Sequence, residues 1–198
     1  MVKEDFYTQS QIDKLGNTII YLCNKIKPLY KTKLLKLLYL LEEISIKKNG
    51  MPFLGLNFEV WKLGPVAKDI FIELSSTPTF LSSFIAVEDH GEDSICIGAI
   101  KDFSDDEFSA ADLEILDLVA EKFKTTTAND LVKITHTENR PWYITAMQHG
   151  VLELFNANQK NNTDIKIDLS MLLDDRQEMK AFYLTSLEHI QQSKWLKR

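Results

Sequence analysis

The sequence predicts a mainly helical fold: a compact helical bundle around a central buried helix, with a small antiparallel β-hairpin. Three observations lead to this prediction. Residues 30–48 are apolar on nearly every side, which is typical of a helix at the centre of a bundle. Most other segments repeat apolar residues at helical spacing. Residues 85–87 and 94–100, on either side of an acidic turn, indicate a hairpin.

The first two helices are expected before residue 50. A capping box in residues 8–11 starts the first helix, which ends near Lys27 because Pro28 cannot continue it. The central helix runs from about residue 30 to residue 48, and Asn49–Gly50 supplies the turn beyond it.

The dipeptide Gly64–Pro65 indicates another helix start. Glycine enters a turn without steric cost, and proline suits the first helical position, whose N–H has no intrahelical partner. We therefore expect a helix from Pro65 to about Leu74, with its apolar side facing the core.

The second half of the chain contains three further expected helices. Ser109 begins one, and Thr127 caps a short helix that Pro141 prevents from continuing. Residues 156–162 are rich in Asn, Gln and Lys, as is typical of a loop, and the last helix covers about residues 174–194.

The composition is that of an ordinary globular protein, with 44% hydrophobic and 26% charged residues in a chain of 198. No apolar stretch approaches the length of a membrane span, and the N-terminus has no leader pattern, so a cytoplasmic location without a membrane partner is expected. Cys23 and Cys96 lie far apart and are expected to be small buried side chains.

Charge is unevenly distributed along the chain, whose net charge is -6. Residues 1–50 contain nine Lys against five Asp or Glu, whereas residues 84–121 contain twelve acids against the single Lys101. An acidic face suits a basic protein partner, because complementary potentials raise association rates. A solvated surface that keeps the protein in solution explains the same acids equally well.

A group of lysines in the first helices raises the alternative of nucleic-acid binding. No arginine accompanies them, and no helix-turn-helix pattern is visible, so a solvated rim is the preferred interpretation and nucleic acid is not expected as a partner. Lys36 has a second interpretation, as the partner of a buried carboxylate. The group comprises Lys25, Lys27, Lys31, Lys33 and Lys36.

No catalytic or metal-binding pattern is found, so the chain is not expected to be an enzyme or to hold a metal or cofactor. His136 and Glu138 are the pair nearest to such a site, but the other histidines supply no further ligand at recognisable spacing. We interpret His136 as a structural side chain at a helix C-terminus, bonded to carbonyl groups or to a neighbouring loop. A hydrolase of unrecognised type would instead require a deep pocket around His136 and Glu138.

Three separated motifs carry a family resemblance. They are Lys33-Leu34-Leu35-Lys36-Leu37-Leu38-Tyr39, then Val60-Trp61-Lys62-Leu63-Gly64-Pro65-Val66, and finally Thr135-His136-Thr137-Glu138 with Pro141-Trp142. In this order they resemble the Panacea domain of SocA-like antitoxins, a family that includes GepA-like phage-associated proteins. Val60 departs from the pattern, where alanine is common, and no motif is matched from Val151 onward.

The resemblance implies a domain over residues 1–150 and a C-terminal helical extension, residues 151–198, packed on the same domain. It implies the antitoxin of a type II toxin–antitoxin system, which neutralises a cognate protein toxin by direct binding, with the toxin gene next to its own. Part of the family also presents the toxin to a protease, and a homo-oligomer is compatible with the resemblance. The alternative is a phage- or mobile-element-associated regulator that binds nucleic acid.

The candidate residues fall into two groups. A structural group belongs to the family motifs: Lys36, Tyr39, Gly64, His136, Glu138 and Trp142. A partner-binding group combines the tryptophan turn with the acidic turn of the hairpin: Trp61, Lys62, Pro65, Glu88, Asp89, Glu92 and Asp93. Aromatic side chains dominate interface hot spots, so we expect the turn from Phe58 to Val66 to form a wall of any binding groove.

Overall fold

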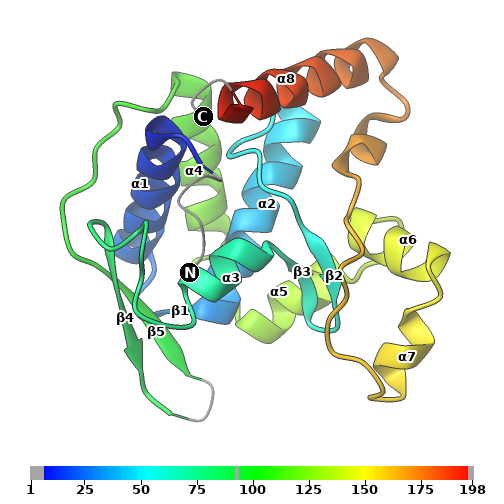
Figure 1. The fold of residues 1–198 in the computed structure, drawn as a ribbon, viewed down its shortest axis with the longest axis horizontal. Helices are drawn as coiled ribbons and strands as arrows, with labels where there is room; N and C mark the ends of the chain where they lie inside the picture. Colours follow the sequence, from blue (N-terminus) through cyan, green and yellow to red (C-terminus); the bar gives the residue numbers. More distant parts are fainter. Residues whose placement is uncertain (1–6, 92–93, 196–198) are drawn as a thin grey trace.

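A computed structural model describes residues 7–91 and 94–195, except for the side chains of residues 191 and 193–195. It confirms the mainly helical fold with small antiparallel sheets (Figure 1). The elements follow in the order α1 (Gln9–Lys25), β1 (Leu29–Tyr30), α2 (Lys31–Asn49), β2 (Glu59–Trp61), β3 (Gly64–Val66), α3 (Lys68–Glu73), β4 (Ile85–Asp89), β5 (Ile95–Ala99), α4 (Ala110–Phe123), α5 (Ala128–Thr135), α6 (Pro141–Gln148), α7 (Leu152–Asn156), the 3₁₀ helix η2 (Leu169–Leu173) and α8 (Gln177–Trp195).

Helix α2 is the centre of the fold, as its all-round apolar pattern predicts. Residues 33–43 are buried without interruption, and α4, α5, β3 and η2 all pack against the helix. The helix ends at Gly50, whose φ of 64° is the left-handed conformation that glycine adopts without strain. Helices α4 and α5, strand β3 and η2 are therefore arranged around one largely apolar helix.

The expected hairpin is present as β4 and β5, and the short strand β1 extends it to three antiparallel strands in the order β1-β5-β4. Val87 and Leu29 both pair with Ile97, whose side chain is buried against the bundle. This sheet packs against α1 (Figure 1).

The predicted helix from Pro65 is wrong in its first residues. Trp61 pairs with Gly64 and Val60 with Pro65, so this segment is a hairpin of β2 and β3, and α3 begins only at Lys68. Gly64 has φ of 98°, which turns the chain back on itself. Proline has no N–H to donate, but it is tolerated in a short edge strand. A Gly-Pro dipeptide is therefore compatible with a hairpin as well as with a helix start.

The C-terminal part of the chain returns to this hairpin. Residues 161–167 lie along β2 and make three backbone hydrogen bonds to β2 and its two flanking residues, Lys62 N–H to Asn161 O, Val60 N–H to Ile165 O and Ile167 N–H to Phe58 O, at 2.8–2.9 Å. The chain then continues through η2 into α8. Among the described residues, no helix is both long enough and apolar enough to cross a membrane.

Candidate functional site

Lys36 lies at the point where the family motifs meet. Its side chain is 1% exposed, and its Nζ donates a hydrogen bond to the carbonyl of Pro65 at 2.9 Å. Burial lowers the pKa of this ammonium to about 7. Neither the solvated rim nor the alternative of a carboxylate partner describes Lys36 in the described part of the chain, because the β2–β3 hairpin covers this face of α2 and presents a backbone carbonyl instead.

Gly64 allows this close approach. A Cβ at this position would lie 2.8 Å from Thr135 Oγ1 and 3.1 Å from Lys36 Cε, and the φ of 98° disfavours any side chain. Pro65, which we expected at a partner surface, is buried. Its contribution is its carbonyl, and the hairpin turn is thus packed directly onto Lys36 and α5.

His136 and Trp142 hold the same hairpin from its other side. The two rings stack with centroids 3.6 Å apart, and Trp142 Nε1 donates to the carbonyl of Trp61 at 3.0 Å. The imidazole Nε2 is buried and has no hydrogen-bond partner among the described residues, unlike our expectation of a bond to a carbonyl or loop. Burial and the nearby Lys36 lower the pKa of His136 to about 4, so the ring is neutral at pH 7.

Glu138 does not join His136. It is exposed after α5 and makes no hydrogen bond or ion pair within the described part of the chain. Residues 7–91 and 94–195 also contain no cluster of three or more His, Cys, Asp or Glu side chains arranged to hold a metal ion. The pair therefore does not have the geometry of an acid–base site.

Tyr39 is fully buried in the core and packs edge-to-face against Phe58, with centroids 5.2 Å apart. Its hydroxyl lies beside Glu43 without a hydrogen bond of standard geometry, and burial raises its pKa well above the usual value. Glu43 is itself buried, and Arg140 Nη1 donates to both of its oxygens at 3.0 Å, while Lys47 Nζ lies 2.6 Å away. This buried ion pair joins α2 to the start of α6.

Glu42 is a second buried carboxylate that sequence reasoning missed. Its oxygens accept the backbone N–H groups of Phe53, Leu54 and Leu56 at 2.8–3.1 Å, which fixes the loop between α2 and β2. Burial raises its pKa, although these hydrogen bonds act in the opposite direction. A signal was available in the sequence: two adjacent acids within a helix that is apolar on every side must be buried and need partners.

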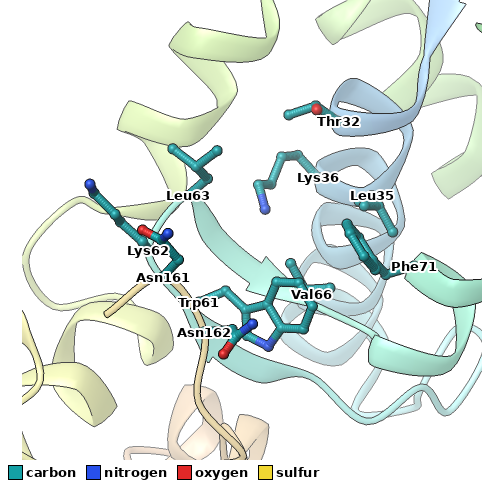
Figure 2. A pocket seen from close by; sticks show the side chains of 10 residues that line it. All are labelled: Thr32, Leu35, Lys36, Trp61, Lys62, Leu63, Val66, Phe71, Asn161 and Asn162. Carbon is teal, nitrogen blue, oxygen red and sulfur yellow. The ribbon is translucent and has the colours of Figure 1, made fainter. Parts of the chain in front are cut away.

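A pocket of about 390 Å³ opens beside the hairpin, and we call it the Lys36 pocket. Figure 2 shows the Lys36 ammonium pointing from α2 into the hollow, with the Trp61 indole on the opposite side. The Trp61 ring packs against the Phe71 ring with centroids 4.8 Å apart, and Lys62 Nζ donates a hydrogen bond to Asn158 Oδ1. The lining residues are Thr32, Leu35, Lys36, Trp61, Lys62, Leu63, Val66, Phe71, Asn161 and Asn162. Sequence reasoning placed the tryptophan turn at such a wall but missed the two asparagines, since nothing local relates them to it.

The acidic turn lies elsewhere in the fold. Glu88 and Asp89 are exposed at the end of β4, in the sheet that packs on α1, whereas the tryptophan hairpin packs on α2, α5 and α6 (Figure 1). Glu92 and Asp93 lie outside the described residues. The two halves of the partner-binding group are therefore separate surfaces.

Many of the charges that made the sequence look polarised pair with each other. Lysines of α1 and α2 contact acids of α4 at 3.0–3.2 Å, in the pairs Lys14–Asp112, Lys25–Asp117, Lys25–Glu121 and Lys48–Glu114. Lys33 is buried and donates to the carbonyl of Lys124, and Lys36 is buried under the hairpin. The five lysines of the first helices therefore do not form one exposed basic surface.

Comparison with known families identifies the chain. The family model described as "Antitoxin SocA-like, Panacea domain" matches residues 34–143, a region that contains Lys36, the tryptophan hairpin, His136 and Trp142. The chain thus belongs to the family of SocA-like antitoxins with a Panacea domain. No curated protein and no solved structure matches it.

Proposed function

We propose that this chain is the antitoxin of a type II toxin–antitoxin system and neutralises a cognate protein toxin by direct binding. Membership of the SocA-like antitoxin family supports the antitoxin function, and the Lys36 pocket, which adjoins a hairpin packed against the core, supports direct binding of a partner. Lys36, Thr135 and Trp142 all contact the hairpin from the buried side, so its outer face is preorganised. Little conformational entropy is lost when such a surface binds a partner.

The exposed side of the hairpin supplies the groups that dominate protein interfaces. Trp61 is half-buried and keeps part of its indole on the pocket wall, and Leu63 is 61% exposed at the tip. Aromatic anchors beside exposed apolar residues are typical of binding hot spots. We place the principal toxin contact here.

Co-expression in a growth-rescue assay tests the proposal. The chain is expressed together with the protein encoded by the neighbouring gene, and wild type is expected to restore growth. Trp61→Ala should lose rescue, whereas Phe182→Ala, which removes a 55% exposed aromatic from α8, should retain it. Equal rescue by both variants would contradict the placement of the contact, and no rescue by wild type would contradict the function.

The acidic turn is the second proposed contact, and it is tested separately. Replacing Glu88, Asp89, Glu92 and Asp93 together by lysine reverses its charge without touching the tryptophan hairpin. Loss of rescue would support a basic toxin surface at this turn. Rescue at the wild-type level would remove the turn from the interface.

A further inference from the structure

We propose, on the basis of the antitoxin function, that the Lys36 pocket receives an acidic side chain from a segment of the toxin. The observation behind this proposal is a buried ammonium at the base of a pocket with apolar walls. The carboxylate would reach Lys36, and the neighbouring residues of the same segment would contact Trp61 and Leu63.

The first step is the bonding capacity of Lys36. An ammonium group has three N–H donors, and in the described part of the chain Lys36 Nζ makes one hydrogen bond, to Pro65 O, and no ion pair. A buried charge without a counter-charge is unfavourable, and burial accordingly lowers its pKa. A carboxylate entering from the pocket would accept the remaining donors and supply the missing charge.

The walls fit the rest of such a side chain. Leu35, Val66 and Phe71 line the same pocket as Lys36, and they match the methylene groups of Glu or Asp. Asn161 and Asn162 are exposed at the rim, and their side-chain amides make no hydrogen bond to the described residues. Free amides at the mouth suit the backbone of a segment that passes across it, which favours an internal acidic residue over a chain terminus.

The surrounding charge has the complementary sign. An adjoining hollow shares Trp61, Phe71 and Asn162 with the Lys36 pocket, and Lys31 Nζ lies 4.5 Å from the Phe71 ring centroid. Among the described residues, the linings of the two hollows contain four lysines and two acids: Lys36, Lys62, Lys68 and Lys160 against Glu59 and Asp164. A positive rim attracts an acidic segment and disfavours a basic one.

A matched pair of substitutions at the pocket mouth tests the sign of the partner. Leu63→Glu and Leu63→Lys remove the same exposed side chain and place opposite charges at the same position. Affinity for the purified protein encoded by the neighbouring gene is measured by isothermal titration calorimetry. Leu63→Glu should bind about 10- to 100-fold more weakly than Leu63→Lys. Equal affinities, or weaker binding by Leu63→Lys, would overturn the proposal while leaving the antitoxin function intact.

Lys36 is tested directly by Lys36→Met, which keeps the apolar stem and removes the charge. Loss of a charged hydrogen-bonding partner should weaken toxin binding about 10- to 100-fold, whereas Lys122→Met on the exposed face of α4 should have no effect. Urea unfolding of each variant establishes that it is folded. A folded Lys36→Met with wild-type affinity would refute the proposal, and failure of wild type to bind the toxin would refute the antitoxin function itself.

A second copy of the chain is the other occupant to be distinguished. Sedimentation of the chain alone, with and without the Leu63 substitutions, measures self-association. An effect of Leu63→Glu on self-association without an effect on toxin binding would assign the pocket to a homo-oligomer and contradict the proposal.

Discussion

The buried Lys36 ammonium should make the free energy of unfolding depend on pH by an amount that can be predicted. Its pKa is about 7 in the folded chain and 10.5 in its ordinary environment. Between these values the unfolded chain binds more protons, so the free energy of unfolding rises with pH. At about 1.36 kcal/mol per pH unit, the total gain is about 4–5 kcal/mol, of which about 3 kcal/mol falls between pH 7 and pH 9.5.

The assay is urea unfolding of wild type and Lys36→Met at a series of pH values. Other groups titrate in both proteins, so the difference between the two isolates Lys36. We expect the stability of wild type relative to the variant to rise by about 3 kcal/mol from pH 7 to pH 9.5. Lys122→Met, which alters an exposed lysine, serves as the control and should run parallel to wild type. A difference between wild type and Lys36→Met that stays constant within about 1 kcal/mol would refute the reasoning.

Three further predictions concern the groups around the hairpin. Arg140→Ala should lower the free energy of unfolding, measured in urea, by about 2–4 kcal/mol, because it leaves the buried Glu43 with Lys47 as its remaining partner. The control Lys48→Ala removes an exposed ion pair and should lower the free energy of unfolding by less than about 1 kcal/mol. Gly64→Ala should lower the free energy of unfolding by about 1–3 kcal/mol, because the alanine would have to adopt a positive φ and its Cβ would lie too close to Thr135. The melting temperature should fall accordingly, and an unchanged melting temperature would contradict this prediction. His136 has a pKa lowered to about 4, so stability should fall as the pH drops from 6.5 towards 4, and His136→Phe should flatten that decline in acid-titration curves.

Helix ends could be predicted from the sequence wherever the signal lies within the helix itself. The capping box at Thr8, the end of α2 at Gly50 and the Ser109 cap are all local signals, and each is confirmed in its side-chain geometry or backbone angle. A cap depends on residues three or four positions away, so no knowledge of the tertiary fold is needed.

The errors arose where a local signal allowed two structures. Gly64–Pro65 suits a helix start and a tight hairpin, and strands of three residues are too short to show alternation. The prediction that Pro141 prevents the preceding helix from continuing is wrong, because α5 already ends at Thr135 and Pro141 is the first residue of α6. The partner of Lys36 could not be predicted, because the Pro65 carbonyl is 29 residues away and is set in place by the hairpin.

The C-terminal segment is part of the site although the family match ends at residue 143. Asn161 and Asn162 form the rim of the Lys36 pocket, and residues 161–167 make backbone hydrogen bonds along the edge of β2 that does not pair with β3. Beyond Gly150 the chain also contributes buried apolar side chains to the same hydrophobic core as the preceding helices: Val151, Phe155, Ile167, Leu169, Leu173 and Tyr183.

We therefore propose that residues 151–198 belong to the same folding unit as residues 1–150. At about 1.5–3 kcal/mol for each fully buried apolar side chain, the six that follow Gly150 together rival the entire net stability of an ordinary domain. A chain ending at Gly150 is expected to lose cooperative unfolding in urea, and with it binding of the toxin. Cooperative unfolding of that shortened chain would show that the matched domain folds by itself. In that case residues 1–150 would form the base of the Lys36 pocket by themselves. The rim residues Asn161 and Asn162 could then be replaced to suit a different partner without affecting the fold of the domain.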